Sequence, residues 1–315
     1  MDGTIHIAAC CDDNYAPYAG VMMLSALEAT PDTPIHFHLV SCGISAQNLE
    51  RLKATVHQGG GTLSAHEPDS DLYQGLPTHR YGPAVYQRIN LPATIPGSVS
   101  RVLYLDSDIL VLGNLKELWD RSLEGQPVGA VENFSPTACR DIGVDRQSYF
   151  NSGVLLMDLA IWRQEALHRT VTEYARDHAD SLQFVDQCSL NAVLQGRWVR
   201  LPAKWNQQAD VYSVMARHAD GCSYTVDELY EAFVAPGIVH FIGKKKPWKI
   251  YCFHPFRAAY RRVLARTPWA GLRAPDESPG MRLKYWTSLG KLWNYQRRRM
   301  QVAAGLRKRM NHGPG

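Results

Sequence analysis

The sequence predicts an α/β protein in which one sheet lies between layers of helices, and three observations indicate this class. Short apolar segments suited to strands alternate with segments of helical periodicity along the first half of the 315 residues. An apolar segment at 101–105 ends in a pair of aspartates, at the edge where open α/β sheets bind ligands. The composition is 45% hydrophobic and 20% charged, which is enough apolar material for one large core.

The first elements alternate regularly. Residues 4–9 are apolar and strand-like, and a helical pattern follows that ends before Pro31. Residues 35–40 alternate as a strand does, residues 45–57 have the pattern of a helix, and three glycines at 59–61 predict a turn. This strand–helix–strand order predicts a parallel unit with helices on both faces of the sheet.

The later elements continue the same pattern. The β-branched and aromatic residues of 101–105 suit a buried strand. The other expected elements are strands at 109–112, 128–131, 153–156 and 238–241 and helices at 162–177 and 186–195. Residues 266–280 are rich in Pro and Gly, so the expected organisation is a main domain over 1–265, a linker over 266–280 and a tail over 281–315.

The tail differs from the rest of the chain in charge. It holds nine of the 34 Lys and Arg and none of the 30 acids, so residues 1–280 carry 25 basic and 30 acidic side chains, a net charge of −5. Apolar residues recur in the tail at three- and four-residue steps: Trp286, Leu289, Trp293, Met300, Ala303 and Met310. A basic, aromatic helix suits an anionic membrane surface, and packing on the main domain is the alternative. The acidic body argues against nucleic acid as a partner.

The cysteines and the N-terminus indicate a compartment. Seven cysteines, an odd count, include the adjacent pair Cys10 and Cys11 and no CxxC motif, which argues against a disulfide framework or a zinc site. The sequence begins without a leader pattern and contains no apolar stretch of about 18 residues. We therefore expect a cytoplasmic protein of bacterial type.

The aspartates Asp106 and Asp108 are the candidate chemical centre. Carboxylates two residues apart at a strand end can bind one hard divalent cation, which could neutralise a departing diphosphate. The pair could also be an ordinary turn, but two unpaired acids beside a buried strand are costly without a cation. A phosphatase of the haloacid dehalogenase type, with Asp106 as nucleophile, is an alternative. Ile109 and Leu110 disfavour it, because such enzymes usually have small polar residues there.

Several motifs occur together in a characteristic order. They are Ala8–Tyr15 (AACCDDNY), Tyr86-Gln87-Arg88, the Asp106-Ser107-Asp108 triplet, Phe150–Leu156 (FNSGVLL), and His240 with Gly243, Lys246, Pro247 and Trp248. With them the chain resembles glycosyltransferase family 8, and within it the bacterial lipooligosaccharide galactosyltransferases, over nearly its whole length. The resemblance implies the GT-A fold (a Rossmann-like mixed sheet between helices), a UDP-sugar donor, a retaining reaction, and Mn²⁺ as cofactor with Mg²⁺ as the alternative.

The resemblance also implies roles for individual residues. The metal ligands would be Asp106, Asp108 and His240. Uridine would be bound by Asp12, Asn14 and Tyr15, the diphosphate by Gly243 and Lys246, and the donor's phosphate or sugar by Arg88. The donor sugar would be bound by Asn151, Asp186 and Gln187, of which Asp186 and Gln187 are the candidate catalytic residues.

These roles agree with the chemistry of the side chains. A tyrosine ring can stack on uracil, and a lysine brings a mobile charge to phosphates, although the acids at 12–13 are also ordinary turn residues. Asp186 or Gln187 could act as a nucleophile, or the acceptor could attack from the side of the leaving group. We favour the second route, because glutamine is a poor nucleophile.

The chain departs from the family where many members carry an aspartate after the Gly-Ala strand. Glu132 or Asn133 takes that place here, and the loops near 69–82 and 207–220 also match poorly. The expected function is transfer of a hexose, galactose first and glucose second, from UDP to a lipopolysaccharide or lipooligosaccharide acceptor at the inner face of the cytoplasmic membrane. A non-catalytic nucleotide-sugar-binding protein is a second alternative. A nucleotidyltransferase is disfavoured, because no Gly-rich basic loop follows the first strand.

Overall fold

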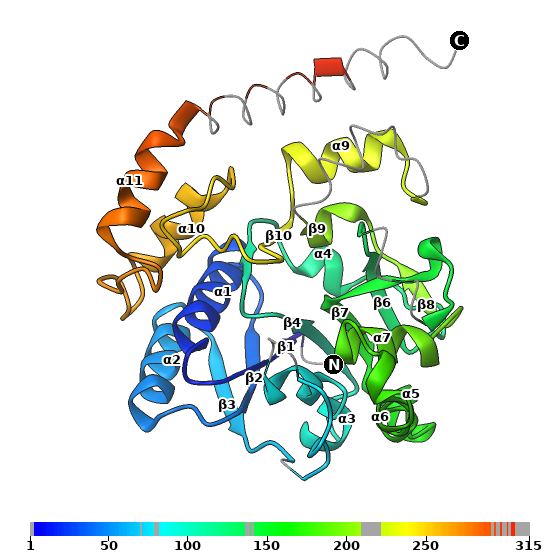
Figure 1. The fold of residues 1–315 in the computed structure, drawn as a ribbon. Helices are drawn as coiled ribbons and strands as arrows, with labels where there is room; N and C mark the ends of the chain where they lie inside the picture. Colours follow the sequence, from blue (N-terminus) through cyan, green and yellow to red (C-terminus); the bar gives the residue numbers. More distant parts are fainter. Residues whose placement is uncertain are drawn as a thin grey trace.

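The structure is a computed structural model that describes residues 3–69, 71–78, 82–135, 139, 142–208, 222–290 and the single residues 293, 297, 301, 304 and 305. A seven-stranded sheet runs through the main body, and helices cover both of its faces (Figure 1). In sheet order the strands are β3 (Thr62–His66), β2 (Ile35–Ser41), β1 (Ile5–Cys11), β4 (Arg101–Leu105), β7 (Phe150–Asp158), β6 (Val128–Glu132) and β8 (Trp198–Arg200).

The strand directions change in the middle of this sheet. β3, β2, β1 and β4 are mutually parallel, as the sequence predicts for the first half. β7 is antiparallel to β4 and to β6. The carboxyl end of β4 therefore lies beside the amino end of β7, where the amide of Asp106 donates a hydrogen bond to the carbonyl of Gly153 at 2.9 Å.

A second, three-stranded sheet completes the site region. β10 (Ile238–His240) lies between β5 (Ile109–Val111), to which it is antiparallel, and β9 (Gln207–Gln208), to which it is parallel. The amide of Phe241 donates to the carbonyl of Asp108 at 3.0 Å. The small sheet thus places the end of β10 directly beside the turn that links β4 to β5.

The helices fall into two layers. The core on one side of the large sheet includes residues of α1 (Ala16–Ala29), α2 (Ala46–Gln58), α9 (Val226–Val234) and α10 (Arg257–Leu264); in this layer α10 packs on α1. The other face packs against α3 (Leu91–Thr94), α5 (Leu159–Gln164), α6 (Leu167–Asp177) and α7 (Val185–Val193). Shorter elements are α4 (Lys116–Trp119), η1 (Pro83–Arg88), η3 (Arg146–Ser148), η4 (Ala179–Ser181) and η5 (Ala203–Asn206), and α11 (Pro279–Thr287) follows the domain.

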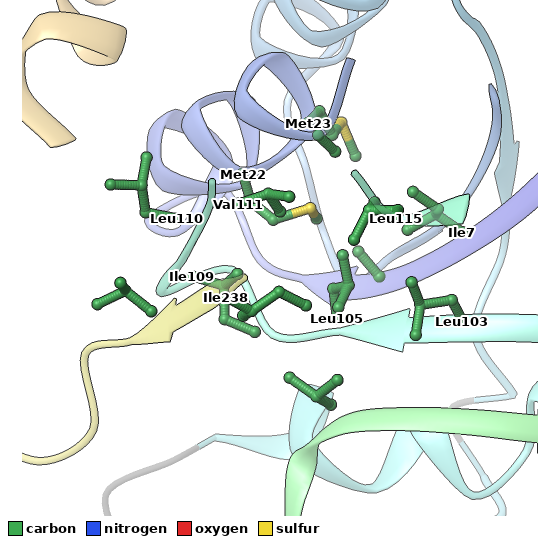
Figure 2. Packing of buried hydrophobic residues seen from close by; sticks show 14 of the residues in the cluster. Ile7, Met22, Met23, Leu103, Leu105, Ile109, Leu110, Val111, Leu115 and Ile238 are labelled. Atoms are coloured by element: carbon green, nitrogen blue, oxygen red, sulfur yellow. The ribbon is translucent and has the colours of Figure 1, made fainter. Parts of the chain in front are cut away.

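The core on the α1 face joins both sheets. Figure 2 shows Met22 and Met23 of α1 in one cluster with residues of β4, β5 and β10, including Leu105, Ile109 and Ile238. These side chains are almost completely buried, and each contributes on the order of 2 kcal/mol of transfer free energy. The cluster therefore holds in place the strand ends that carry the two aspartates and His240.

One expected helix is wrong. The sequence predicts a single helix over 162–177, but α5 ends at Gln164 and α6 begins at Leu167. Between them Ala166 has φ 52° in the left-handed region, which interrupts the helical hydrogen bonds. Both short helices bury apolar side chains in the core on this side of the sheet.

Part of the segment expected as a linker packs on the domain. Trp269 is buried in the α1-face core, and its Nε1 donates to Asn48 Oδ1 at 3.2 Å. The carboxylate of Asp276 accepts from the amide of Ile250 at 2.8 Å. Within the described part of the chain, no helix has the length and apolar content needed to cross a bilayer.

Candidate active site

A cavity of about 500 Å³ opens where the carboxyl ends of β1 and β4 meet the start of β7. Eleven of the twelve residues that the sequence assigns to the site line it; they are Asp12, Tyr15, Arg88, Asp106, Asp108, Asn151, Asp186, Gln187, His240, Gly243 and Lys246. Asn14 is exposed and does not line the cavity. The structure thus brings together residues from six different parts of the chain.

Asp106, Asp108 and His240 form a group of potential metal ligands. One ligand atom from each lies within 4.8 Å of the others, and the part of the chain that the structure describes contains no other such group. His240 Nε2 lies 3.2 Å from Asp108 Oδ1 and 3.6 Å from Asp106 Oδ2. Two carboxylates and an imidazole at this spacing are a suitable donor set for a divalent cation.

Glycine is required at position 153 for this arrangement. A Cβ atom there would lie 2.2 Å from His240 Cε1 and 2.7 Å from Asp106 Oδ2, far closer than atoms can pack. The absent side chain is what allows the imidazole and the carboxylate to approach β7. The sequence analysis included Gly153 within a family motif but assigned it no role.

Arg88 joins the metal group to the opposite wall of the cavity. Its guanidinium contacts Asp106 Oδ1 at 2.9 Å and Asp186 Oδ2 at 3.1 Å. Burial alone would lower the pKa of Arg88, but the two carboxylates outweigh it and raise that pKa above its ordinary value. Tyr104 also donates its hydroxyl hydrogen to Asp106 Oδ1 at 2.7 Å. Arg88 therefore acts within the protein as a charged link between the partly exposed Asp106 and the buried Asp186.

Lys246 pairs with the second aspartate. Its ammonium contacts Asp108 Oδ2 and donates to the carbonyl of Phe241 at 2.8 Å. Burial opposes ionisation of Asp108, yet Lys246 and then His240 hold its pKa well below the usual range. Asp108 is therefore charged at neutral pH.

The wall opposite the metal group carries amides and an acid. Asn151 Nδ2 donates to Gln187 Oε1 at 3.1 Å, and Ser152 Oγ donates to Asp186 Oδ2 at 3.2 Å. Val185, just before these two α7 residues, has φ 37°, which a β-branched residue rarely adopts. The backbone is thus held in a strained turn that directs Asp186 and Gln187 into the cavity.

The entrance on the β1 side is aromatic. Tyr15 is 40% exposed, and its ring meets Trp248 edge to face at 6.2 Å between centroids. Asp12 Oδ1 accepts from the amide of Tyr15 at 3.0 Å, which is the turn geometry that the sequence offered as an alternative. Asp12 and Tyr15 nevertheless line the cavity, so both can contact a ligand.

Glu132 and Asn133, the two candidate residues at the end of β6, lie in different surroundings. Asn133 lines the cavity, whereas Glu132 is buried away from it and accepts a hydrogen bond from the amide of Ser223 at 3.0 Å. Of these two residues, Asn133 is therefore the one that can contact a ligand. Sequence reasoning gave no role to Tyr104, Ser152, Gly153 or Asn206, all of which contact site residues.

Asp186 makes the stability of the protein depend on pH. Burial raises its pKa from 3.8 to about 6, although Arg88 acts in the opposite direction. Because the folded-state pKa is the higher one, the stability that Asp186 contributes is present below 3.8 and is lost as pH rises through about 6. Between about pH 4 and pH 7 the wild type should lose about 2 kcal/mol of unfolding free energy relative to Asp186→Asn.

Chemical denaturation of both proteins across this range measures the difference. Differences in packing or hydrogen bonding that do not depend on ionisation shift the curves apart by a constant amount, so only the slope of the difference with pH is informative. A pH-independent difference would contradict the raised pKa.

The comparisons with known proteins agree with this geometry. The Glycosyl transferase family 8 model matches residues 6–252. General stress protein A of Bacillus subtilis is 31% identical, over 87% of this chain and 98% of that protein. The lipopolysaccharide 1,3-galactosyltransferase of Salmonella typhimurium is 24% identical, over 89% of this chain and 83% of that protein.

A solved structure matches closely in fold. The galactosyltransferase LgtC, in complex with donor and acceptor sugar analogs, superposes with a TM-score of 0.75 at 29% identity, over 88% of this chain and all of that chain. The fold and the site therefore define a GT-A glycosyltransferase, which confirms the predicted fold class and the prediction of an enzyme of this kind. The chain belongs to glycosyltransferase family 8, so the resemblance in the motifs is also confirmed. The phosphatase alternative is not favoured.

Proposed function

We propose that the protein is a retaining hexosyltransferase that moves galactose, or as second choice glucose, from UDP to a lipopolysaccharide or lipooligosaccharide acceptor. The observation that carries the proposal is the meeting of an Asp-Asp-His group, a lysine and a wall of amides in one cavity. Relatives named as lipopolysaccharide 1,2-glucosyltransferase and 1,3-galactosyltransferase support the choice of sugars and acceptor.

Asp106, Asp108 and His240 would hold the metal, with Mn²⁺ preferred and Mg²⁺ as the alternative. An imidazole beside two carboxylates favours Mn²⁺, because Mg²⁺ prefers oxygen ligands alone. The cation would supply the positive charge that stabilises a departing diphosphate. The ammonium of Lys246 and the flexible backbone at Gly243, which has φ 77°, would contact the phosphate oxygens from the other side.

The sugar would lie against Asn151, Asp186 and Gln187. Asp186 Oδ2 already accepts a hydrogen bond from Ser152 Oγ and forms an ion pair with Arg88 Nε at 3.1 Å. Gln187 Oε1 accepts from the amide of Ser152 and from Asn151 Nδ2, both at 3.1 Å. Because these two oxygens already have hydrogen-bond or ion-pair partners, they are poorly placed as nucleophiles. This supports attack by the acceptor from the side of the leaving group, with Asp186 and Gln187 shaping the sugar pocket.

Release of UDP from a panel of UDP-sugars, with Mn²⁺ and with EDTA, tests the proposal. We expect metal-dependent release from UDP-galactose, and more slowly from UDP-glucose, with transfer when a saccharide acceptor is added. Absence of release from every sugar, with no thermal stabilisation by UDP and Mn²⁺, would reject the function. Turnover-free binding of UDP-sugar would instead indicate a binding protein.

We also propose that the basic tail binds the inner face of the bacterial cytoplasmic membrane, where a lipid-linked acceptor would be presented. Tyr285 of α11 stacks on Phe253 of the domain at 5.5 Å, whereas Leu283 and Trp286 are about two-thirds exposed. Trp293 is 72% exposed. Exposed apolar rings beside basic residues suit an anionic lipid surface. Nine of the basic and apolar residues that the sequence analysis counts in the tail lie outside the residues that the structure describes: Lys291, Arg298, Arg299, Met300, Ala303, Arg307, Lys308, Arg309 and Met310.

A triple variant tests the tail without removing α11. Replacing Leu283, Trp286 and Trp293 by serine should weaken sedimentation with phosphatidylglycerol liposomes at least about 10-fold, because roughly 1.5–3 kcal/mol is lost for each large apolar side chain. Turnover of a soluble acceptor should stay unchanged. Val234→Ser, at another exposed apolar side chain on α9, is the matched control. Equal liposome binding by the triple variant and the control would contradict the membrane role.

A further inference from the structure

Asn206 lies behind the cavity and connects its two walls. It ends η5, is completely buried, and does not line the cavity, so it cannot touch a ligand. Its side chain lies between His240, whose Nδ1 is 3.0 Å from Asn206 Oδ1, and Asn151, whose Oδ1 is 2.9 Å from Asn206 Nδ2. One amide thus contacts a candidate metal ligand and a candidate sugar-binding residue.

A backbone amide fixes the direction of the hydrogen bonds that link Asn151, Asn206 and His240. The amide of Gly153 can only donate, and it donates to Asn151 Oδ1 at 3.1 Å. The same oxygen must therefore accept from the Nδ2 group of Asn206, which leaves Asn206 Oδ1 as the acceptor facing the imidazole. His240 Nδ1 must then carry a hydrogen. The lone pair that can bind a cation is on Nε2, the nitrogen that faces Asp106 and Asp108.

A second backbone amide fixes the orientation of Gln187, at the other end of this series of hydrogen bonds. Ser152 N donates to Gln187 Oε1, so Gln187 presents its Nε2 group to the hydroxyl of Tyr149 at 3.2 Å. Asn151 Nδ2 donates to the same Gln187 oxygen. The buried side chains from His240 to Tyr149 therefore have one consistent orientation, and Asn206 is the member that joins the imidazole to the amides.

We propose that Asn206 is a positioning residue that fixes the metal-binding tautomer and orientation of His240 and couples them to the sugar-binding amides. The inference rests on the proposed function, since it assumes that His240 binds the metal. Hydrogen-bond partners of a ligating imidazole typically account for about 10–100-fold in metal affinity. Asn206 also orients Asn151, and through Asn151 it would affect the affinity for the donor sugar.

Two substitutions separate the two contacts. Asn206→Leu keeps the branched shape of the side chain and removes both hydrogen bonds. Asn206→Asp keeps an oxygen acceptor for His240 Nδ1 but places its second oxygen against Asn151 Oδ1, which Gly153 N prevents from turning away. The first variant should weaken Mn²⁺ binding about 10–100-fold. The second should retain Mn²⁺ affinity within about 3-fold and weaken binding of the UDP-sugar instead.

Electron paramagnetic resonance of free Mn²⁺ measures metal affinity without turnover, and competition with Mg²⁺ measures selectivity. Loss of an oriented imidazole should reduce Mn²⁺ affinity more than Mg²⁺ affinity, whereas general unfolding would reduce both equally. Gln208→Leu is the matched control. Gln208 is an equally buried amide, and among the described residues its side chain hydrogen-bonds the backbone at Phe134 N and Glu132 O. The control should lose thermal stability but keep the Mn²⁺ affinity of the wild type.

The outcomes are distinct. Wild-type affinity for Mn²⁺ in Asn206→Leu, or an unchanged preference for Mn²⁺ over Mg²⁺, would overturn the role of Asn206 and leave the proposed function intact. Failure of the wild type itself to bind Mn²⁺ would overturn both. If Asn206→Leu does not fold, the contrast between Asn206→Asp and Gln208→Leu decides: equal UDP-sugar affinity in these two variants would reject the coupling.

Discussion

Asp108→Asn should abolish metal-dependent sugar transfer, with a loss of turnover of at least about 10³-fold. The asparagine has the same shape but lacks the charge that a divalent cation requires, and it leaves Lys246 without its carboxylate partner. Asp108 is a cleaner choice than Asp106, because Asp106 also forms a buried ion pair with Arg88, whose loss would destabilise the fold. Mn²⁺ titration and UDP release of the variant measure the effect.

The control for this variant is Asp120→Asn, which removes an exposed acid on the surface beside Lys116. It should leave turnover and the thermal transition unchanged. Substantial activity in Asp108→Asn that remains sensitive to EDTA would show that the metal is bound elsewhere. The assignment of the Asp-Asp-His group would then be wrong.

Gly153→Ala should reduce turnover about 100-fold, because the new methyl group would displace the His240 ring from the position that Asn206 and the two carboxylates define. The ring cannot move without breaking a buried hydrogen bond, so we also expect a loss of about 1–3 kcal/mol in unfolding free energy. The turnover rate, measured by steady-state kinetics, and the affinity for Mn²⁺ should decrease together.

Gly97→Ala is the matched control for this substitution. A Cβ at Gly97 meets nothing within 4 Å, so activity and stability should stay at the wild-type level. Normal Mn²⁺ binding by Gly153→Ala would mean that the imidazole does not occupy its observed place in the working enzyme.

The sequence predicts the strands around the two aspartates well, because their apolar residues are continuous and the polar turn follows directly. Motifs spread along the chain from Ala8 to Trp248 also identify eleven of the residues that line the cavity. The break between α5 and α6 could not be predicted, since neither Gly nor Pro marks it and the packing against the sheet imposes it.

The roles of Gly153 and Asn206 could not be predicted for a related reason. Asn206 acts through Asn151 and His240, and a single sequence carries no sign that these three residues meet. The closeness of Gly153 to His240 likewise depends on the antiparallel placement of β7 beside β4. Residues that contact a ligand leave motifs, whereas residues that orient them are found only through tertiary structure.

The small sheet has a consequence for how the enzyme is made. Its central strand, β10, pairs with β5 from the middle of the chain, and His240 is its last residue. A chain emerging from the ribosome can build the parallel part of the large sheet long before residue 240 is synthesised, but long-range pairing of this kind forms late and slowly. Until then the two aspartates have no imidazole beside them. The proposed metal site, with all three of its ligands in place, is therefore completed only after β10 has paired with β5.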